Sequence, residues 1–163
     1  MEITIIVDDI LSLGGSQSFA FNLSNYLTSN AYKVKLISLK KINSEVKIEK
    51  CEIISLNLKS NFFLIFHQEK INKLTKNSDI ILNLSGQTFM YFSLLEFNNK
   101  FIFRESNQPL DRLNSMNFVK RLISRYLYTN FLKKNPNLIV QNPIASEQLK
   151  ALSKNNLINH NVF

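Results

Sequence analysis

The sequence predicts an α/β fold, a doubly wound parallel sheet with helices on both faces. Short, continuously apolar segments recur along the chain, which is typical of strands buried on both sides. Segments with helical spacing of apolar residues separate them, which indicates βαβ units. A length of 163 residues, 45% of them hydrophobic, suits one domain with a sizeable core. We therefore expect a single Rossmann-like domain over residues 1–163.

Six segments are expected to be strands, and a seventh, residues 157–163, is either a last short strand or the start of a linker. Ile3 to Val7 and Asp79 to Leu84 are apolar runs of the kind that forms buried strands. Lys33 to Leu39 alternates between polar and apolar residues at first and then becomes apolar. The remaining candidates are shorter or weaker, and they cover residues 53–58, 101–103 and 137–141.

Helical patterns fill the intervals between these strands. The first helix follows Ser16 and carries Phe19, Leu23 and Leu27 on one stripe. Further helices are expected over residues 61–74, 87–97, 118–134 and 143–152, with Pro143 suited to a helix start. Residues 104–114 are expected to form a polar loop.

Composition limits the classes of partner and the compartment. The net charge of +8 favours a negatively charged partner, although abundant Lys, Asn and Ile also fit the codon usage of an AT-rich genome. No nucleic-acid-binding motif occurs, so nucleic acid is not expected. Cys51 is the sole cysteine, which excludes an intrachain disulfide and favours a reducing cytoplasm. We expect neither a signal peptide nor a membrane span, because no suitable apolar run occurs.

Two of the three glycines, Gly14 and Gly15, follow the first expected strand and precede a helix. Ligands of parallel sheets bind beyond the carboxyl ends of the strands, and free N–H groups at a helix start favour an anion. These residues therefore suggest a phosphate-binding loop, and the alternative is an ordinary strand-to-helix turn. A nicotinamide-binding domain is disfavoured, because the three-glycine fingerprint is missing and Lys40-Lys41 stands where an acidic residue is needed. The P-loop signature is also absent.

The acidic pair Asp8-Asp9 is reminiscent of response-regulator receivers, which bind a metal ion there. Such a receiver also needs an aspartate that accepts a phosphoryl group at the end of a later strand. The comparable segment DIILNLSG offers Asn83, which cannot be phosphorylated. A working receiver is therefore not expected.

Four segments in order resemble family-4-type glycosyltransferases of the GT-B fold, in which two Rossmann-like domains join across a cleft. The first is LSLGGSQSFAFNLSNYLTSNAYKVKLISL, similar to a Gly-Gly-x-Glu-type loop, a helix and a second strand. Gln17 stands where the family often has Glu, and Asn30-Ala31-Tyr32 replaces the usual Gly-His turn. The others are SDIILNLSG, KFIFRESNQP and NLIVQNPIASEQL, where Asn142-Pro143 replaces the usual Ser. The final NLINHNVF resembles the segment where the family's first domain ends.

The resemblance implies the acceptor-side domain of a retaining, metal-independent transferase that uses a nucleotide sugar as its substrate. Its glycine loop would face the donor's diphosphate and sugar through Gly14, Gly15, Ser16 and Gln17. In the family, a second domain with a Glu-x7-Glu-type motif holds most of the donor nucleotide, and this sequence stops before such a segment. We therefore expect a hexosyl-type transferase domain of cell-surface glycan synthesis that is inactive without a second domain in cis or in trans. The alternative is a non-catalytic subunit that recruits a membrane-linked acceptor for a partner chain.

Polar residues after the first, fourth and fifth expected strands are candidates for the acceptor cleft. They are Asp9, Ser85, Gln87, Arg104, Glu105 and Asn107. For Asp9 the alternative is capping of a turn, and for Ser85 it is capping of a helix. For Arg104 and Glu105 the alternative is an ion pair that merely orders the loop. His67 and His160 have no metal-ligand partner at useful spacing, so we expect no metal site.

The segment 118–134 combines a broad apolar face with basic residues, which are Lys120, Arg121, Arg125, Lys133 and Lys134. Such a helix can lie on an anionic membrane surface, which would place the protein at the inner face of the membrane. The alternative is a helix packed on the core with a solvated basic face.

Overall fold

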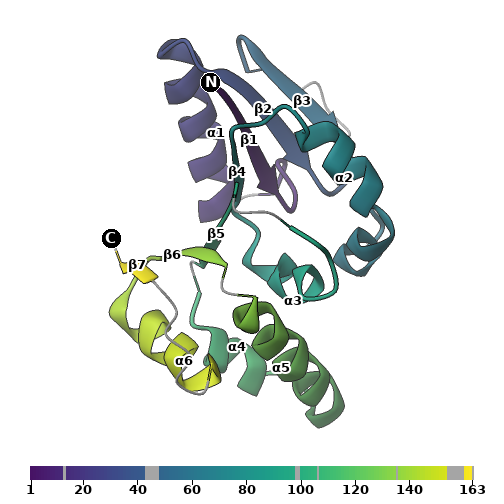
Figure 1. Ribbon diagram of the computed structural model, residues 1–163, viewed down its shortest axis with the longest axis vertical. Helices are drawn as coiled ribbons and strands as arrows, with labels where there is room; N and C mark the ends of the chain where they lie inside the picture. The colour runs from purple at the N-terminus through teal and green to yellow at the C-terminus, as the bar shows by residue number, and fades with distance from the viewer. Residues whose placement is uncertain are drawn as a thin grey trace.

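The computed structural model describes residues 1–12, 14–42, 48–97, 100–105, 107–134, 136–153 and 160–162. Its sheet has seven strands in the order β3-β2-β1-β4-β5-β6-β7, and every neighbouring pair is parallel (Figure 1). The strands are β1 (Glu2–Val7), β2 (Lys33–Ser38), β3 (Cys51–Ser55), β4 (Ile80–Asn83), β5 (Phe101–Glu105), β6 (Asn137–Val140) and β7 (His160–Val162). The predicted parallel α/β sheet is confirmed.

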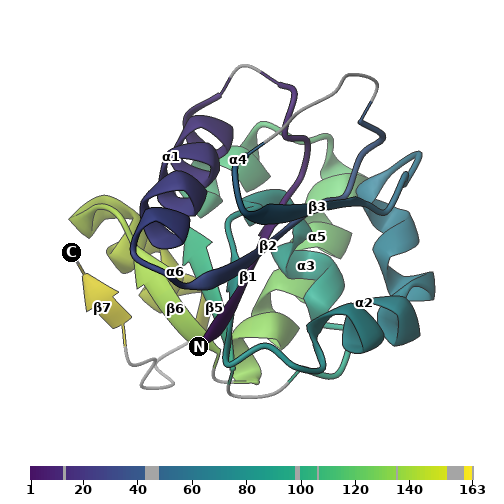
Figure 2. The same cartoon turned by 90° about the horizontal axis from the view of Figure 1, so that it is seen from above.

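The helices connect successive strands. They are α1 (Gly15–Ser29), α2 (Gln68–Thr75), α3 (Phe89–Phe92), α4 (Pro109–Asn114), α5 (Phe118–Lys133) and α6 (Pro143–Ser153). Two 3-10 helices, η1 (Asn61–Phe66) and η2 (Gly86–Thr88), precede α2 and α3. Figure 2 shows α1 on one side of the strands and α2, α3 and α5 on the other, so the sheet is covered on both faces as predicted.

Alternating strand residues divide the apolar core into two clusters, one on each face of the sheet. In the larger cluster, the strands β4, β5 and β6 pack against buried side chains from each of the helices α2 to α6. Aromatic rings fill its centre, where the centroids of Phe103 and Phe131 lie 4.8 Å apart and those of Phe89 and Phe103 lie 5.5 Å apart. The smaller cluster packs β1 and β2 against Ala20, Leu23 and Leu27 of α1.

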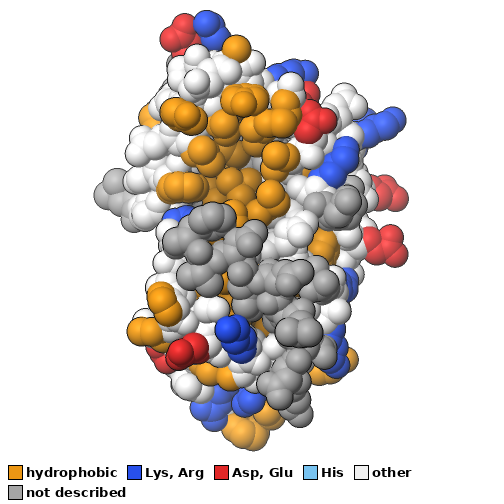
Figure 3. All heavy atoms as spheres, turned by 60° about the vertical axis from the view of Figure 1, so that its left-hand side comes forward, with side chains coloured by type: hydrophobic (Ala, Val, Ile, Leu, Met, Phe, Trp, Pro, Cys, Tyr) orange, Lys and Arg blue, Asp and Glu red, His pale blue; other side chains and the backbone are white. Residues whose placement is uncertain are grey.

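The two faces are covered unequally. Among the described helices, only α1 contributes to the smaller cluster. Ile102 and Ile139 alternate with core residues of the larger cluster, so they point to the α1 side, where they are only half-buried. Figure 3, which brings the side with α1 forward, shows apolar side chains gathered in one patch. The doubly wound prediction holds, but one face has a single described helix over it.

Three connections differ from the sequence prediction. The expected loop 104–114 contains α4, which starts with Pro109 at its first position, where a missing N–H costs nothing. The expected helix 61–74 is divided at His67, whose Nδ1 lies 2.8 Å from the carbonyl oxygen of Phe63. The expected helix 87–97 is reduced to η2 and α3, and directly after the end of α3 the Ser93 hydroxyl donates to the Met90 carbonyl.

The turn that ends α1 holds one residue in a strained backbone conformation. The amide of Tyr32 donates to Leu27 O, and that of Ala31 donates to Thr28 O, which together form a Schellman motif. Ala31 takes the left-handed conformation that this motif requires, with φ of 63°. An L side chain carries strain in this conformation, which glycine adopts freely.

We expect Ala31→Gly to raise the free energy of unfolding by about 0.5 to 1 kcal/mol, because relief of the left-handed strain exceeds the added freedom of the unfolded chain. Urea denaturation followed by circular dichroism measures the change. The control is Asn25→Gly, an exposed position inside the same helix, which should lower stability. Equal effects of the two glycines would contradict the strain at Ala31.

Candidate functional site

Because the strands are parallel, the loops that follow β1, β4 and β5 lie at the same edge of the sheet. A pocket of about 140 Å³ opens at this edge. Its lining residues come from these three loops and from the start of α1, and they are Asp8, Gly15, Ser16, Gln17, Leu84, Ser85, Gly86 and Asn107. We call it the glycine pocket. Five residues predicted for the site line it: Gly15, Ser16, Gln17, Ser85 and Asn107.

The glycine loop leaves the start of α1 open. A side chain at Gly15 would meet no atom within 4 Å, whereas one at Gly14 would lie 2.5 Å from Gln17 Oε1. No side chain caps the first turn of this 15-residue helix. Its free N–H groups and positive dipole end therefore favour an anion. None of the described glycines has a positive φ, so these glycines provide space rather than a left-handed turn.

Two buried polar atoms in the glycine pocket lack partners within the described structure. The Oγ of Ser85 and the Oδ1 of Asp8 make no hydrogen bond there. Ser85 does not cap the following 3-10 helix, so the capping alternative does not describe it. Buried polar atoms are normally hydrogen-bonded, which marks both groups as available to a ligand.

Asp8 and Asp9 have different roles. Asp9 Oδ1 accepts a hydrogen bond of 2.9 Å from the Leu11 amide, so Asp9 caps the turn, as its alternative interpretation had it. Asp8 lines the glycine pocket instead, and the sequence interpretation missed it. Both residues follow the same buried strand. Which of them faces the edge of the sheet depends on the residue at which that strand ends. Gln87 lies in η2, and its side chain is outside the described part of the structure.

Arg104 and Glu105 diverge to opposite faces of the sheet, as successive strand residues do. The guanidinium of Arg104 lies over the Phe19 ring of α1, 4.3 Å from its centroid, in a cation–π contact. Burial lowers the pKa of Arg104. Arg104 does not line the glycine pocket.

Glu105 is completely buried and ties three segments together. Its Oε1 accepts a hydrogen bond of 3.0 Å from the Asn107 amide, and its Oε2 accepts one from the Tyr128 hydroxyl of α5. A side chain at Gly86 would lie 3.0 Å from Oε1, so Gly86 lets the two loops approach closely. Glu105 thus supports the wall of the glycine pocket rather than lining it.

Burial and the neighbouring Glu105 carboxylate raise the pKa of Tyr128 well above its ordinary value of 10. The hydroxyl of Tyr128 keeps its proton to a higher pH in the folded chain than in the unfolded chain. This difference stabilises the folded state, and the contribution is fully present below the pKa of the tyrosine in the unfolded chain. That contribution is lost as the pH rises above about 10 and the unfolded chain ionises.

We expect Tyr128→Phe to lower the free energy of unfolding at pH 7 by about 1 to 3 kcal/mol, because Glu105 loses a buried donor. The decline in stability above about pH 10 should also become shallower than in the wild type. Denaturation at several pH values measures both effects. Tyr26→Phe, at an exposed tyrosine, is the control and should change neither. An unchanged pH profile in Tyr128→Phe would contradict this role.

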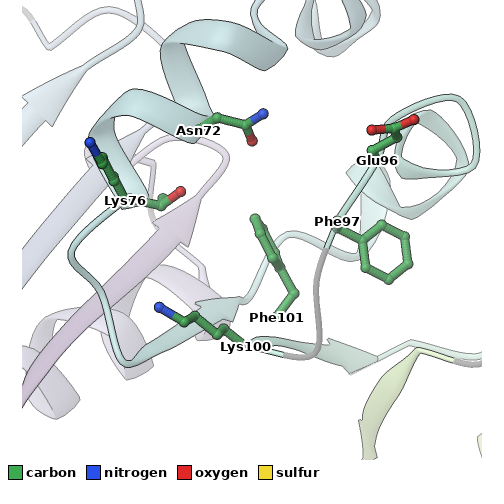
Figure 4. A pocket seen from close by; sticks show the side chains of 7 residues that line it. Asn72, Lys76, Glu96, Phe97, Lys100 and Phe101 are labelled. Atoms are coloured by element: carbon green, nitrogen blue, oxygen red, sulfur yellow. The ribbon is translucent and has the colours of Figure 1, made fainter.

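A different pocket lies at the opposite edge of the sheet, where β5 begins. It has a volume of about 320 Å³ and is lined by Asn72, Thr75, Lys76, Glu96, Phe97, Lys100 and Phe101. Figure 4 shows Asn72 and Lys76 on one side of it, and Glu96 and Phe97 across from them. Because ligands of such sheets bind beyond the carboxyl ends of the strands, this pocket is not the candidate site.

The basic residues of α5 lie in different environments. Phe118, Val119, Leu122, Ile123 and Tyr126, all more than half exposed, form an apolar stripe. Helical spacing places the stripe opposite the buried side, with Lys120, Arg121 and Arg125 along its borders. The Lys133 side chain is exposed farther along the helix. The ammonium of Lys134 is engaged by the carbonyl of Leu95 at 2.7 Å, away from the stripe.

Neither a metal cluster nor a membrane span stands out in the described ranges. No three His, Cys, Asp or Glu side chains gather there in a way that could hold a metal ion. Likewise, none of the helices in those ranges is long and apolar enough to cross a bilayer. His160 belongs to β7, and its side chain lies outside the description.

Solved structures match the fold over nearly the whole chain. A sucrose-phosphate synthase from Thermosynechococcus elongatus superposes with a TM-score of 0.69 and 15% sequence identity, over 99% of this chain and 47% of that one. WaaG, a glycosyltransferase involved in lipopolysaccharide biosynthesis, gives 0.68 and 11%, over 98% of this chain and 44% of that one. The chain has the fold of one domain of a GT-B glycosyltransferase.

This chain spans about half the length of each of these proteins. No model of a protein family matches its sequence, and no curated protein sequence does. At identities of 15% and 11% the likeness establishes the fold.

Proposed function

We propose that this chain is the acceptor-side domain of a nucleotide-sugar-dependent, hexosyl-type glycosyltransferase of cell-surface glycan synthesis. The observation that carries the proposal is the glycine pocket, where the open start of α1 meets Asp8, Ser85 and Asn107. The backbone amides at Gly15, Ser16 and Gln17 suit the donor's diphosphate, and the unpaired oxygens of Asp8 and Ser85 suit sugar hydroxyls. The reaction would need no metal, because helix amides meet the phosphate charge.

Catalysis would require a second domain, in cis or in trans. The two glycosyltransferases that share the fold are each about twice as long as this chain. The glycine pocket, at about 140 Å³, is small for a whole nucleotide sugar, since ligand pockets usually exceed about 300 Å³. This size supports a half-site that holds the phosphates while another domain holds the nucleotide, so the chain alone would be inactive.

Nuclear magnetic resonance titration of the chain with UDP, GDP or ADP tests the glycine pocket, because chemical shifts register weak binding. We expect the largest changes at the amides of Gly15, Ser16 and Gln17. Gly15→Val should abolish them without unfolding, since its side chain would occupy open pocket space. Asn25→Val, on an exposed face of the same helix, is the control. Shift changes absent from this loop with all three nucleotides would overturn the phosphate role.

The stripe on α5 supports attachment to the inner face of a membrane. Large apolar side chains exposed on one helix face, bordered by basic residues, are typical of helices that lie in an anionic interface. The helix contains no acidic residue, so its charge is complementary to such a surface. A membrane-linked acceptor would then be presented to the neighbouring edge of the sheet.

Vesicle flotation tests this attachment. We expect the chain to float with vesicles of phosphatidylcholine and phosphatidylglycerol, less so at high salt, and not with phosphatidylcholine alone. Ile123→Ser and Arg125→Gln should each weaken flotation, while Lys73→Gln on α2 should not. Equal flotation of all variants would exclude the stripe as the contact. Flotation without any nucleotide response would favour the alternative of a non-catalytic recruiting subunit.

A further inference from the structure

We propose that a second cavity at the carboxyl edge binds a phosphate group of the acceptor. Its volume is about 540 Å³, within the usual range for ligand pockets. Residues from β1, β2, η1, α3, α4 and α5 or their adjoining loops line it, and they are Asp8, Lys40, Ser60, Asn61, Met90, Tyr91, Arg112, Met116 and Lys120. We call it the Arg112 cavity. As an acceptor site it rests on the proposed function, whereas its affinity for phosphate follows from its own charges.

Three cationic side chains and one carboxylate line the Arg112 cavity. Lys40, Arg112 and Lys120 provide the positive charge, and Asp8 provides the negative charge. The excess of positive charge favours an anion, and low-dielectric walls concentrate such a field. Phosphate suits this set best, because guanidinium and ammonium groups are its usual partners in proteins.

The guanidinium of Arg112 lacks the partners that a buried cation requires. Its Nε, Nη1 and Nη2 atoms are all buried, and none has a hydrogen-bond partner in the described ranges. The guanidinium carbon lies 5.7 Å from the centroid of the Tyr128 ring, in a cation–π contact. This contact provides no acceptor for the N–H groups, which point outward in the plane of the guanidinium. Burying a charge without hydrogen bonds is costly, and an anion in the cavity would remove that cost.

A second unpaired group supports the same site. Asn61, nine-tenths buried at the start of η1, has an Oδ1 atom without a partner in the structure as described. Its amide can accept from or donate to hydroxyls beside a phosphate. Asn61 and Arg112 are far apart in sequence, so the fold alone brings these two unsatisfied groups to one cavity.

Asp8 lines both the glycine pocket and the Arg112 cavity. A phosphate held at Arg112 would therefore direct the hydroxyls of the same molecule toward Asp8 and the donor site. Lys120 extends the cavity to α5, where the exposed apolar stripe begins. The acceptor class is thus a phosphorylated polyol or sugar, either free or carried by a lipid.

Calorimetric titration of the whole chain with glycerol 3-phosphate tests the cavity, with glycerol as the uncharged control. We expect saturable binding of glycerol 3-phosphate alone. Arg112→Met, which keeps an apolar stem of similar size, and Lys120→Gln should each weaken binding about tenfold or more, since each removes a charge-assisted hydrogen bond. Lys133→Gln, on the same helix outside the cavity, should leave the affinity unchanged.

If Arg112→Met fails to fold, substitutions of Lys120 and Lys40 still test the cavity. Lys120 is exposed and Lys40 is half-buried, so replacing either should leave the fold intact. Unchanged affinity in both Lys120→Gln and Lys40→Gln would overturn the proposal, as would the absence of saturable binding by the wild type. The nucleotide titration is independent of this result. Nucleotide shifts that persist without phosphate binding would remove the Arg112 cavity and leave the donor role intact, and the reverse would remove the donor role.

The source of the phosphate is resolved by comparing vesicles. Phosphatidic acid carries a phosphate monoester, and phosphatidylglycerol carries a diester, whereas both are anionic. Stronger flotation with phosphatidic acid that disappears in Arg112→Met identifies a lipid-borne phosphate. Equal flotation with both lipids, together with binding of glycerol 3-phosphate, identifies a free phosphorylated acceptor.

Discussion

The parallel direction of every strand is the constraint on which the rest of this structure depends. It collects the loops after β1, β4 and β5 at one edge and brings residues distant in sequence around a common site. Right-handed crossovers then decide the faces: α1, on the way outward from β1 to β2, covers one side, and the helices after β3 cover the other. The glycine pocket and the Arg112 cavity both follow from this arrangement, and Asp8 at the end of β1 is their common wall.

The buried carboxylate of Glu105 links the segments at this edge. Through the Asn107 amide and the Tyr128 hydroxyl, it connects the loop after β5 to α5. Tyr128 in turn packs against Phe89, Phe131 and the Arg112 guanidinium. One network of contacts therefore supports the wall of the glycine pocket and positions the cation of the Arg112 cavity. A change in the core below Glu105 would affect both cavities.

Much of the fold followed from local sequence patterns, because buried parallel strands must be apolar throughout and their helices must be amphipathic. The strands at β1, β2 and β4 and the helices α1, α5 and α6 fall close to their expected ranges. The predictions were weakest where short-range polar contacts compete with the pattern. A Pro-initiated helix lay inside an expected loop, a turn at His67 divided one expected helix, and another expected helix ended early, at Phe92.

Sequence alone determined the fold class, the glycine loop before α1 and the basic, apolar character of α5, since each is a property of neighbouring residues. Only the tertiary structure decided that Asp8 rather than Asp9 faces the site, and that Arg104 and Glu105 turn to opposite faces. It alone also brought Arg112, Asn61 and Lys40 to one cavity. The physical reason is that unsatisfied charges and hydrogen-bonding groups become a site only when packing brings them together and excludes water from them.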